Sequence, residues 1–561
     1  MNLLRYPLAL WGQGVGRIVS SMAVVGVALA VVAGAAASTV QGQTPTLGDS
    51  HQSYLRMLDI SGLGHLGSWT IRRPDGGHGM DADRGLGGDS VWAHPWGGRL
   101  RTEPSGSDAE PVVVDGESRL RLFGNSRLPR GGNDGPVWQG RGLTTAADAS
   151  VGLRWRGLSA TFNPTLIHNQ NAAFDLAPVQ PAGQPIYAYP WRRIDYPQRY
   201  GPDSYWTFDL GESQIALDWR AARLSFGNES MWWGPGIRNA IVMSNNAPGF
   251  LHASLATNRP VDIGIGQLEG QWIWGGLEQS KYVDSTAETD RYITGIVLAY
   301  SPSWLEGLTV GGTRLFQAYR PADGLPVGDY LLVFQGLTKT SQISEEQPEG
   351  NDEADQMASL FARWVFPESG AEVYVEWART DHALDLEDFL QEPEHSQGYT
   401  LGLQKVTSRS EDRIFVLTGE LTHLESAATF QLRPRPTYYQ HGVVTQGHTN
   451  RGQILGAWIG PGGNSQFLGF EMFAPWGSSE VFLQRQVHDN DAFWVWAEAN
   501  DQTFDAHHVS FDLGVQTLIF RGDFEFGGGA MITRQINRWF FGPHLWNLNL
   551  SLSARWRPGM N

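Results

Sequence analysis

The sequence predicts an all-β transmembrane fold, an antiparallel β-barrel, and three observations support this prediction. Strand-length segments in which apolar and polar residues alternate fill most of the chain after residue 124. The chain holds 23 Trp, 25 Phe, 16 Tyr and 68 Gly, although hydrophobic residues make up 41% and mean hydropathy is -0.29. It also begins with a segment typical of export. In a transmembrane barrel, one side of each strand meets lipid, aromatic residues mark both interfaces and the interior is polar.

Residues 1–37 are expected to be a signal peptide. Arg5 and Arg17 precede an apolar run at 22–32, and the small residues at 35–37 follow it. This order of charge, apolar core and small residues is that of a cleavable export signal. An uncleaved inner-membrane anchor is the alternative, but the core is short and rich in alanine rather than leucine. Either interpretation predicts export.

Residues 38–124 are expected to form a small, partly helical periplasmic segment. Asp49 is placed to cap a short helix that carries Tyr54 and Leu58 on one face. Glycine-rich pieces and an acidic stretch follow. The segment has too few apolar residues for a core of its own, so we expect it to pack against something larger.

The final strand shows the alternation most clearly. Its apolar face carries Trp546, Leu548, Leu550, Leu552, Ala554 and Trp556. Its polar face carries Asn547, Asn549, Ser551, Ser553 and Arg555. The period is the two residues of a β-strand, and the length reaches the roughly 9–11 residues that cross a bilayer as a tilted strand. A tryptophan at each end fits the aromatic belts of the membrane interfaces.

Residues 125–561 are therefore expected to form an outer-membrane β-barrel. Similar alternation recurs at 292–300, 372–377 and 523–533. At roughly 24 residues for a strand and its connection, about 430 residues give on the order of 16–18 strands. A soluble β-sandwich is the alternative. Bulky side chains on both faces, charged residues on the polar faces and aromatics near strand ends favour the barrel.

Composition and motifs exclude several classes of function. The chain has no cysteine and a formal charge of -17, so it has neither disulfides nor the basic stripe that nucleic acid requires. It contains no G-x-S-x-G or H-E-x-x-H motif. We therefore predict no nucleic-acid partner, no cofactor, no metal and no catalytic residue. An outer-membrane hydrolase whose serine nucleophile has partners on distant strands stays open.

Two histidine-containing pieces are better explained by a structural role than by catalysis or metal binding. The sequence His-Asp-Asn-Asp at 488–491 brings an imidazole near two carboxylates, but it follows a strand-like run where a turn is expected. His507 and His508 lack metal-ligand spacing with supporting carboxylates. We interpret the first piece as a turn and assign neither a site.

The stretch 228–250 is the least explicable by secondary structure alone. Trp232 and Trp233 run into Gly-Pro-Gly, and Ser244, Asn245 and Asn246 follow a short apolar run. Aromatic faces beside amides suit a sugar ring, which has apolar C–H faces and hydroxyl edges. In the alternative, the tryptophans belong to an interface girdle and the polar trio satisfies buried backbone groups. From the residues alone, this structural alternative ranks first.

A second polar stretch, 438–452, raises the same question. It includes Tyr439, His441 and Arg451, together with many other hydrogen-bonding side chains. Such a stretch is too polar for a lipid-facing strand. It suits either the interior of the barrel or a loop.

These stretches resemble the signature of the Wzi-type capsule assembly family. The matching pieces are Trp-Gly-Pro-Gly at 233–236 with Ser-Asn-Asn-Ala-Pro at 244–248, the run 438–456, and the pieces at 125–142 and 163–164. The resemblance implies an outer-membrane β-barrel, typically of 18 strands, with a small helical periplasmic element. It implies a lectin-like, non-enzymatic role in attaching or organising capsular or other surface polysaccharide. A general diffusion porin is the alternative function.

The resemblance also implies candidate site residues and partners. The polysaccharide-binding positions would be Trp232, Trp233, Ser244, Asn245, Asn246, Tyr439, His441 and Arg451. The expected partners are the polysaccharide, outer-membrane lipid and lipopolysaccharide, and the barrel assembly machinery. The chain departs from the family pattern in its weakly helical N-terminal segment and in the five residues that follow Trp556.

Overall fold

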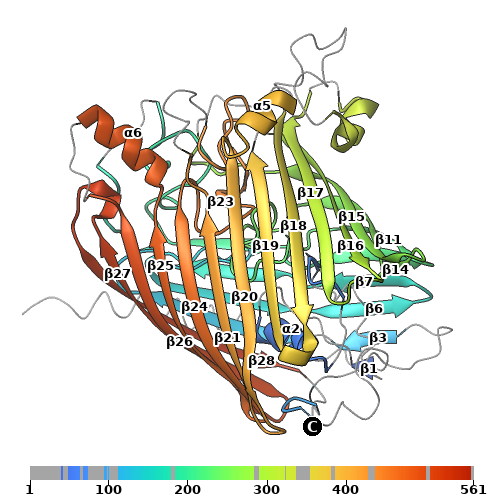
Figure 1. Cartoon of the computed structure of the whole chain (residues 1–561). Coiled ribbons are helices and arrows are strands. Elements are labelled where there is room, and N and C mark those ends of the chain that lie inside the picture. The colour runs from blue at the N-terminus through green and yellow to red at the C-terminus, as the bar shows by residue number, and fades with distance from the viewer. Residues whose placement is uncertain are drawn as a thin grey trace, which may run out of the picture.

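The computed structural model describes residues 40–41, 49–63, 67–73, 94–97, 99, 112–115, 117–178, 183–283, 290–321, 324–336, 354–380, 386–427, 436–500 and 506–557. One large sheet, antiparallel except where β1 pairs with β3, dominates this part of the chain and curves round into a barrel-shaped wall (Figure 1). Two small sheets accompany it. The first joins β2 (Ile71–Arg72) to β12 (Trp232–Trp233), and the second joins β22 (Thr449–Asn450) to β23 (Gln453–Ile454).

The first strands of the large sheet are short pieces that follow one another closely. They are β1 (Val40–Gln41), β3 (Val112–Asp115), β4 (Ser118–Asn125), β5 (Gly142–Ala149), β6 (Val151–Trp155), β7 (Leu158–Phe162), β8 (Thr165–Asn169), β9 (Tyr205–Asp209), β10 (Gln214–Trp219), β11 (Ala222–Gly227), β13 (His252–Thr257) and β14 (Val261–Asp262). β3 and β4 together pair with β6 and β5, and β7 and β8 together pair with β10 and β9.

The later strands are longer and mostly uninterrupted. They are β15 (Gly266–Leu277), β16 (Arg291–Pro302), β17 (Leu308–Tyr319), β18 (Asp355–Phe366), β19 (Ala371–Thr380), β20 (Gln397–Arg409), β21 (Ile414–His423), β24 (Asn464–Ala474), β25 (Gly477–Val487), β26 (Val509–Arg521), β27 (Phe524–Ile536) and β28 (Leu545–Trp556). Each pairs with the next. β28 also pairs with β4, so the last strand lies beside one of the first.

The strands have the alternation that the sequence predicts. In β28, Leu548 and Leu552 are 44% and 62% exposed on the outer face. Asn547 and Arg555 point inward and are 2% and 7% exposed. The outer face is thus apolar and the inner face polar, an arrangement that suits a lipid-facing wall around a polar interior.

The described helices are few and short. They are α2 (Ser50–Ile60), α5 (Leu386–Gln391), α6 (Asn490–Asn500) and the 3₁₀ segments η1 (Val327–Phe334), η2 (Pro367–Ser369) and η4 (Arg538–Phe540). Within the residues described, none of these helices has both the length and the apolar character needed to cross a membrane. The predicted helix at Asp49 is confirmed as α2, since the Asp49 side chain accepts from the N–H groups of His51 and Gln52 at 3.0 and 3.1 Å.

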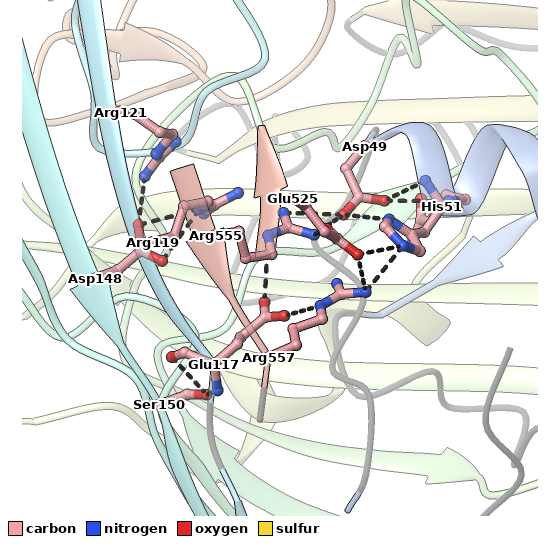
Figure 2. A network of polar contacts seen from close by, with 11 residues as sticks. Asp49, His51, Glu117, Arg119, Arg121, Asp148, Ser150, Glu525, Arg555 and Arg557 are labelled. Carbon is pink, nitrogen blue, oxygen red and sulfur yellow. Dashed lines mark hydrogen bonds and ion pairs between the residues drawn. The ribbon is translucent and has the colours of Figure 1, made fainter. Parts of the chain in front are cut away.

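A network of charges anchors α2 to the last two long strands (Figure 2). Asp49 accepts from Arg555 on β28 at 3.1 Å, and Glu525 on β27 pairs with His51 at 3.2 Å. Arg557 joins the same network, with 3.1 Å between its guanidinium and Glu525. Because every member is substantially buried, each charge depends on the others for compensation.

The connections differ between the two ends of the wall. At the end that holds α2 and the last residue of β28, turns such as 156–157, 220–221 and 522–523 are short. At the other end the connections are long, and α5 and α6 belong to them (Figure 1). Two of these long connections turn into the interior: 228–251, and the described parts of the connection after β21, 424–427 and 436–463.

Carboxylates on the inner face of the wall hold the interior connections by their backbone. Glu420 on β21 accepts from the N–H groups of Ile237, Arg238 and Asn239 at 2.6, 3.1 and 2.8 Å. Glu376 on β19 accepts from the N–H of Ile241, further along the same connection, at 3.1 Å. Each of these backbone groups would otherwise be unsatisfied in a buried turn.

Replacing Asp49 tests the anchoring of α2. Burial alone would raise the pKa of Asp49, but Arg555, His51 and Arg557 together lower it below 3.8. A lowered pKa contributes stability above the ordinary aspartate range, and this contribution is lost as the pH falls through the lowered value. Asp49→Asn keeps the capping oxygen and removes the charge. We therefore expect a lower thermal unfolding temperature than wild type at pH 7 and a much smaller difference at pH 3.

The matched control for this test is Asp262→Asn. Asp262 is exposed and accepts one backbone N–H, from Gly264 at 2.7 Å. It forms no ion pair within the described residues. An equal loss of stability in both variants at pH 7 would contradict the role of the charge network.

Replacing Glu420 tests how the interior connection is held. Hydrogen bonds to a charged group contribute about 1.5–3 kcal/mol each, so Glu420→Gln is expected to loosen the turn at 237–239. We expect lower stability towards urea and more frequent ion-conducting openings in planar bilayers. Glu368→Gln, in the exposed turn after β18, makes the same chemical change without such contacts. Wild-type conductance in Glu420→Gln would count against the proposed attachment.

Candidate functional site

The two stretches that the sequence singles out lie against each other in the interior. The N–H of Ser244 donates to the carbonyl of Leu455 at 2.7 Å, and Nε2 of His448 lies 2.7 Å from the carbonyl of Val242. Burial lowers the pKa of His448, so a neutral ring that donates Nε2–H fits this contact. Connections from β11–β13 and β21–β24 thus form one packed unit.

Trp232 and Trp233 are both 0% exposed. The guanidinium of Arg72 lies 4.3 Å over the Trp232 ring, and the Trp232 indole N–H donates to the carbonyl of Gly236 at 3.0 Å. Trp233 donates to Oε1 of Gln271 on the inner face of β15 at 3.0 Å. The girdle interpretation is therefore wrong for both rings, since neither lies on the outer face. Neither ring has surface available to a ligand in this conformation.

The turn after these tryptophans requires glycine at position 234. Gly234 has φ +100°, a conformation that side-chain-bearing residues rarely adopt. A Cβ at this position would also lie 2.8 Å from Oε2 of Glu376. The Trp-Gly-Pro-Gly motif is thus explained by a tight turn that passes close to a wall carboxylate.

The side chains of Ser244 and Asn246 satisfy backbone groups, as the structural interpretation proposes. Oγ of Ser244 donates to the carbonyl of Gly456 at 2.7 Å, and Nδ2 of Asn246 donates to that of Ile454 at 2.8 Å. The carbonyl of Asn245 accepts from the N–H of Gly135 at 2.7 Å. All three residues are buried. They join three connections that are distant in sequence.

Tyr439, His441 and Arg451 differ in their exposure. Tyr439 is buried, and its hydroxyl donates to the carbonyl of Ile241 while accepting from the N–H of Ala457, both at 2.8 Å. Burial raises the pKa of Tyr439, which keeps the hydroxyl protonated for this role. His441 and Arg451 are partly exposed. Polysaccharide contact by the eight family positions stays a prediction, and these two alone among them present side-chain surface.

A cavity of about 190 Å³ lies beside this packed unit, at the end of the wall with long connections. Its aromatic lining consists of Trp138, Phe174, Tyr189, Tyr196, Trp458 and Trp539. Its charged and polar lining includes Arg130, Gln486, His488, Asp489, His508 and Arg538. Apart from Gln486 on β25 and Gln535 on β27, the lining residues come from connections rather than strands. The cavity is therefore built by loops on a rigid scaffold, which is common for binding sites.

Asp489 is the carboxylate in this lining, and its oxygens are engaged. The Tyr189 hydroxyl donates to it at 2.7 Å, and Arg192 forms an ion pair with it at 2.9 Å. Burial raises the pKa of Asp489, although Arg192 opposes that shift. Asp489 also accepts from the N–H of Ala492 at 3.1 Å, at the start of α6. The predicted turn at 488–491 is thus a helix start that helps to line the cavity.

Two histidines stack in the cavity wall. The rings of His488 and His508 have centroids 4.2 Å apart, and Nε2 of His488 lies 2.6 Å from Oγ of Ser510. Burial and the nearby Arg538 lower the pKa of His508 to about 3. Burial likewise lowers the pKa of His488, so both rings are neutral at physiological pH. In the part of the chain described, no group of three or more potential ligands is placed to hold a metal ion.

This arrangement can bind a sugar. Aromatic rings offer faces to apolar C–H groups, and arginine, histidine and glutamine side chains offer hydrogen bonds to hydroxyls. The sequence pattern alone does not single out Trp458, Trp539 or Arg538. One signal for them exists: Trp458 lies in a glycine- and proline-rich piece, 456–463, like that around Trp233. Their convergence depends on the fold and cannot be read from local pattern.

Comparisons with known proteins agree on one family. The family described as "Capsule assembly protein Wzi" matches residues 129–490, which is more than half of the chain. No curated protein sequence was found to match. The chain resembles the solved structure of Wzi, an outer membrane protein involved in group 1 capsule assembly in Escherichia coli and described as a carbohydrate-binding β-barrel. The TM-score is 0.60 at 12% identity, covering 92% of this chain and 99% of that one.

Weaker likenesses exist to two other solved structures. OccAB2 of Acinetobacter baumannii has a TM-score of 0.40 at 10% identity, covering 81% of this chain and 99% of that one. OccD3 of Pseudomonas aeruginosa has a TM-score of 0.39 at 9% identity, covering 82% and 95%. The fold shown by the first likeness is a β-barrel, and the match over 129–490 spans both interior stretches and most of the cavity lining. This chain belongs to the Wzi capsule assembly protein family.

Proposed function

We propose that this protein is a non-enzymatic outer-membrane β-barrel that binds capsular or other surface polysaccharide and holds it at the cell surface. The observation that carries the proposal is the cavity walled by Trp138, Trp458, Trp539 and two tyrosines. Family membership supports it, and so does the likeness to a carbohydrate-binding barrel of E. coli.

The two ends of the wall suggest its orientation. Outer-membrane barrels have short periplasmic turns and longer extracellular loops. By this rule α2 and the last residue of β28 face the periplasm, and the cavity faces the outside, where polysaccharide is held. We propose a division into a signal peptide at 1–37, a periplasmic segment from residue 38, and the barrel. The barrel in this proposal begins at β3 rather than at the expected residue 125, because β4 pairs with both β5 and β28. The signal peptide lies outside the described residues.

We further propose that the wall is a closed barrel of about 18 strands. In this count, β3 with β4, β5 with β6, β7 with β8 and β9 with β10 each form one bent strand. The pairing of β28 with β4 supports closure. The exposed apolar outer face would contact outer-membrane lipid and lipopolysaccharide, and insertion would need the barrel assembly machinery.

Two observations favour binding over the alternatives. The interior holds two packed connections whose backbone is bonded to side chains of the wall, which argues against an open diffusion porin. In the cavity, the carboxylate of Asp489 is held by Arg192 and Tyr189, an arrangement that suits recognition better than proton transfer. We propose that the family positions in the interior hold the cavity loops in place.

Deleting the gene is expected to loosen surface polysaccharide without stopping its synthesis. The assay compares cell-bound polysaccharide with polysaccharide released into the medium, in wild-type, deletion and complemented strains. We expect a larger released fraction in the deletion strain and an unchanged total. Full retention of every surface glycan in the deletion strain would rule the function out.

Trp458→Ala and Trp539→Ala test the cavity directly. Each change removes an aromatic wall, so we expect purified protein to bind the polysaccharide at least about tenfold more weakly, which is about 1.4 kcal/mol. Trp304→Ala is the matched control, because Trp304 is 69% exposed in a short turn at the opposite end. Heat-modifiable migration checks that each variant folds. Wild-type affinity in both cavity variants would move the binding site elsewhere.

A further inference from the structure

Arg538 is a buried cation in the cavity wall without a carboxylate partner. It is 6% exposed and lies in η4, between β27 and β28. Nη1 donates to the backbone carbonyl of Asp175 at 2.6 Å, and the rings of Trp539 and Phe174 lie 5.3 and 5.7 Å from the guanidinium carbon. The carboxylate of Asp175 is exposed, and no ion pair joins Arg538 to any described residue. Buried charges in proteins are normally paired.

The other charges in the lining are compensated. Arg130 forms an ion pair with Asp512 and donates to Oε1 of Gln486 at 2.8 Å. Asp489 is matched by Arg192. His488 and His508 in the cavity wall are neutral, because burial lowers the pKa of each ring. Arg538 is therefore left as one unmatched positive charge facing a cavity of about 190 Å³.

The neighbouring groups respond to this positive charge. Burial lowers the pKa of Arg538 to about 10, and Asp175 opposes the shift without cancelling it. After burial, the charge of Arg538 is the next cause of the low pKa of His508. Burial is the main cause of the low pKa of His488, and His508, Arg130 and Arg538 lower it further. The potential at this end of the cavity is thus positive, although the whole chain carries a formal charge of -17.

We propose that the cavity selects an acidic sugar unit, a pyranose that carries a carboxylate, and seats that carboxylate on Arg538. This inference rests on the proposed polysaccharide-binding function and names the chemical class of the unit bound. A carboxylate matches the planar guanidinium and accepts two parallel N–H groups from it. The ring of the sugar would then lie against Trp539 and Trp458. Tyr196 also lines the cavity, and in this proposal its hydroxyl donates to a ring substituent.

The alternative, a neutral sugar, fits the charges less well. A neutral unit would leave the guanidinium buried without a compensating negative charge, which is unfavourable. An anionic unit removes this cost on binding. The arginine whose burial is unfavourable without an anion is therefore the group that discriminates between acidic and neutral units.

The decisive experiment compares two forms of one polysaccharide. Surface polysaccharide purified from the host strain is divided, and in one half the carboxyl groups are reduced to primary alcohols. Binding of both halves to the full-length, folded barrel is measured by titration calorimetry. We expect the reduced form to bind at least about tenfold more weakly, which is about 1.4 kcal/mol. Equal affinity for both forms, or a host polysaccharide without acidic sugars, would overturn the inference.

Variants at two neighbouring arginines assign the preference to Arg538. Arg538→Gln is expected to bind both forms equally, and Arg538→Lys to keep part of the preference for the native form. Arg534→Gln is the matched control: Arg534 lies 5.0 Å over the Trp546 ring, outside the cavity lining, and this variant should keep the wild-type preference. If Arg538→Gln also prefers the native form to the wild-type degree, the carboxylate does not bind at Arg538.

The possible results distinguish a failure of the acidic preference from a failure of the proposed polysaccharide binding. Binding of both forms with equal affinity, lost in Trp458→Ala, leaves the cavity as a sugar site and removes only its acidic preference. Binding of neither form removes the proposed function itself. If Arg538→Gln does not fold, the comparison of the two polysaccharides with the wild-type barrel still decides whether an acidic unit is selected.

Discussion

The carboxylate of Glu420 holds the interior of this protein together. It gathers three consecutive backbone N–H groups, at 237–239, from a connection that enters the barrel between β11 and β13. With that turn fixed, the tryptophans before it pack against the inner wall, and the polar trio after it reaches the connection between β21 and β24. That connection carries Trp458, so a single wall carboxylate indirectly supports the cavity.

The acidic composition has a structural explanation. Inward-facing acids such as Glu372, Glu376 and Glu420 accept hydrogen bonds from arginines or from buried backbone groups, and these bonds offset part of the cost of burying charge. Arginine rather than lysine supplies their partners, as its planar fork permits several bonds at once. The negative charge of the chain is therefore partly internal. An acidic protein can thus present a locally positive cavity to an anionic polymer.

The wall could be predicted from sequence because its signal is local. Alternation in 546–556 requires no knowledge of neighbouring strands, and Asp49 caps α2 within three residues. The interior could not be predicted in this way. Trp232 and Trp233 look like girdle or ligand residues because aromatic rings beside glycine and proline occur in all these settings. Their burial follows from contacts with Gln271 and Arg72, far away in sequence. The cavity could not be predicted from the sequence for the same reason. Its lining residues, among them Arg130, Tyr196, Trp458 and Arg538, meet only in the folded chain.

The attachment of α2 has a consequence for biogenesis. Asp49 and His51 are among the first described residues, and their partners Arg555, Arg557 and Glu525 are among the last. The N-terminal end of the helix therefore has no such charge partners until the C-terminal hairpin has been made and placed. Arg56 and Asp59, further along α2, pair with Glu372 on β19 and Arg363 on β18, so a chain that stops before β27 would hold the helix at one end only. The first turn of α2 can therefore form its ion pairs only after the last strands are in place.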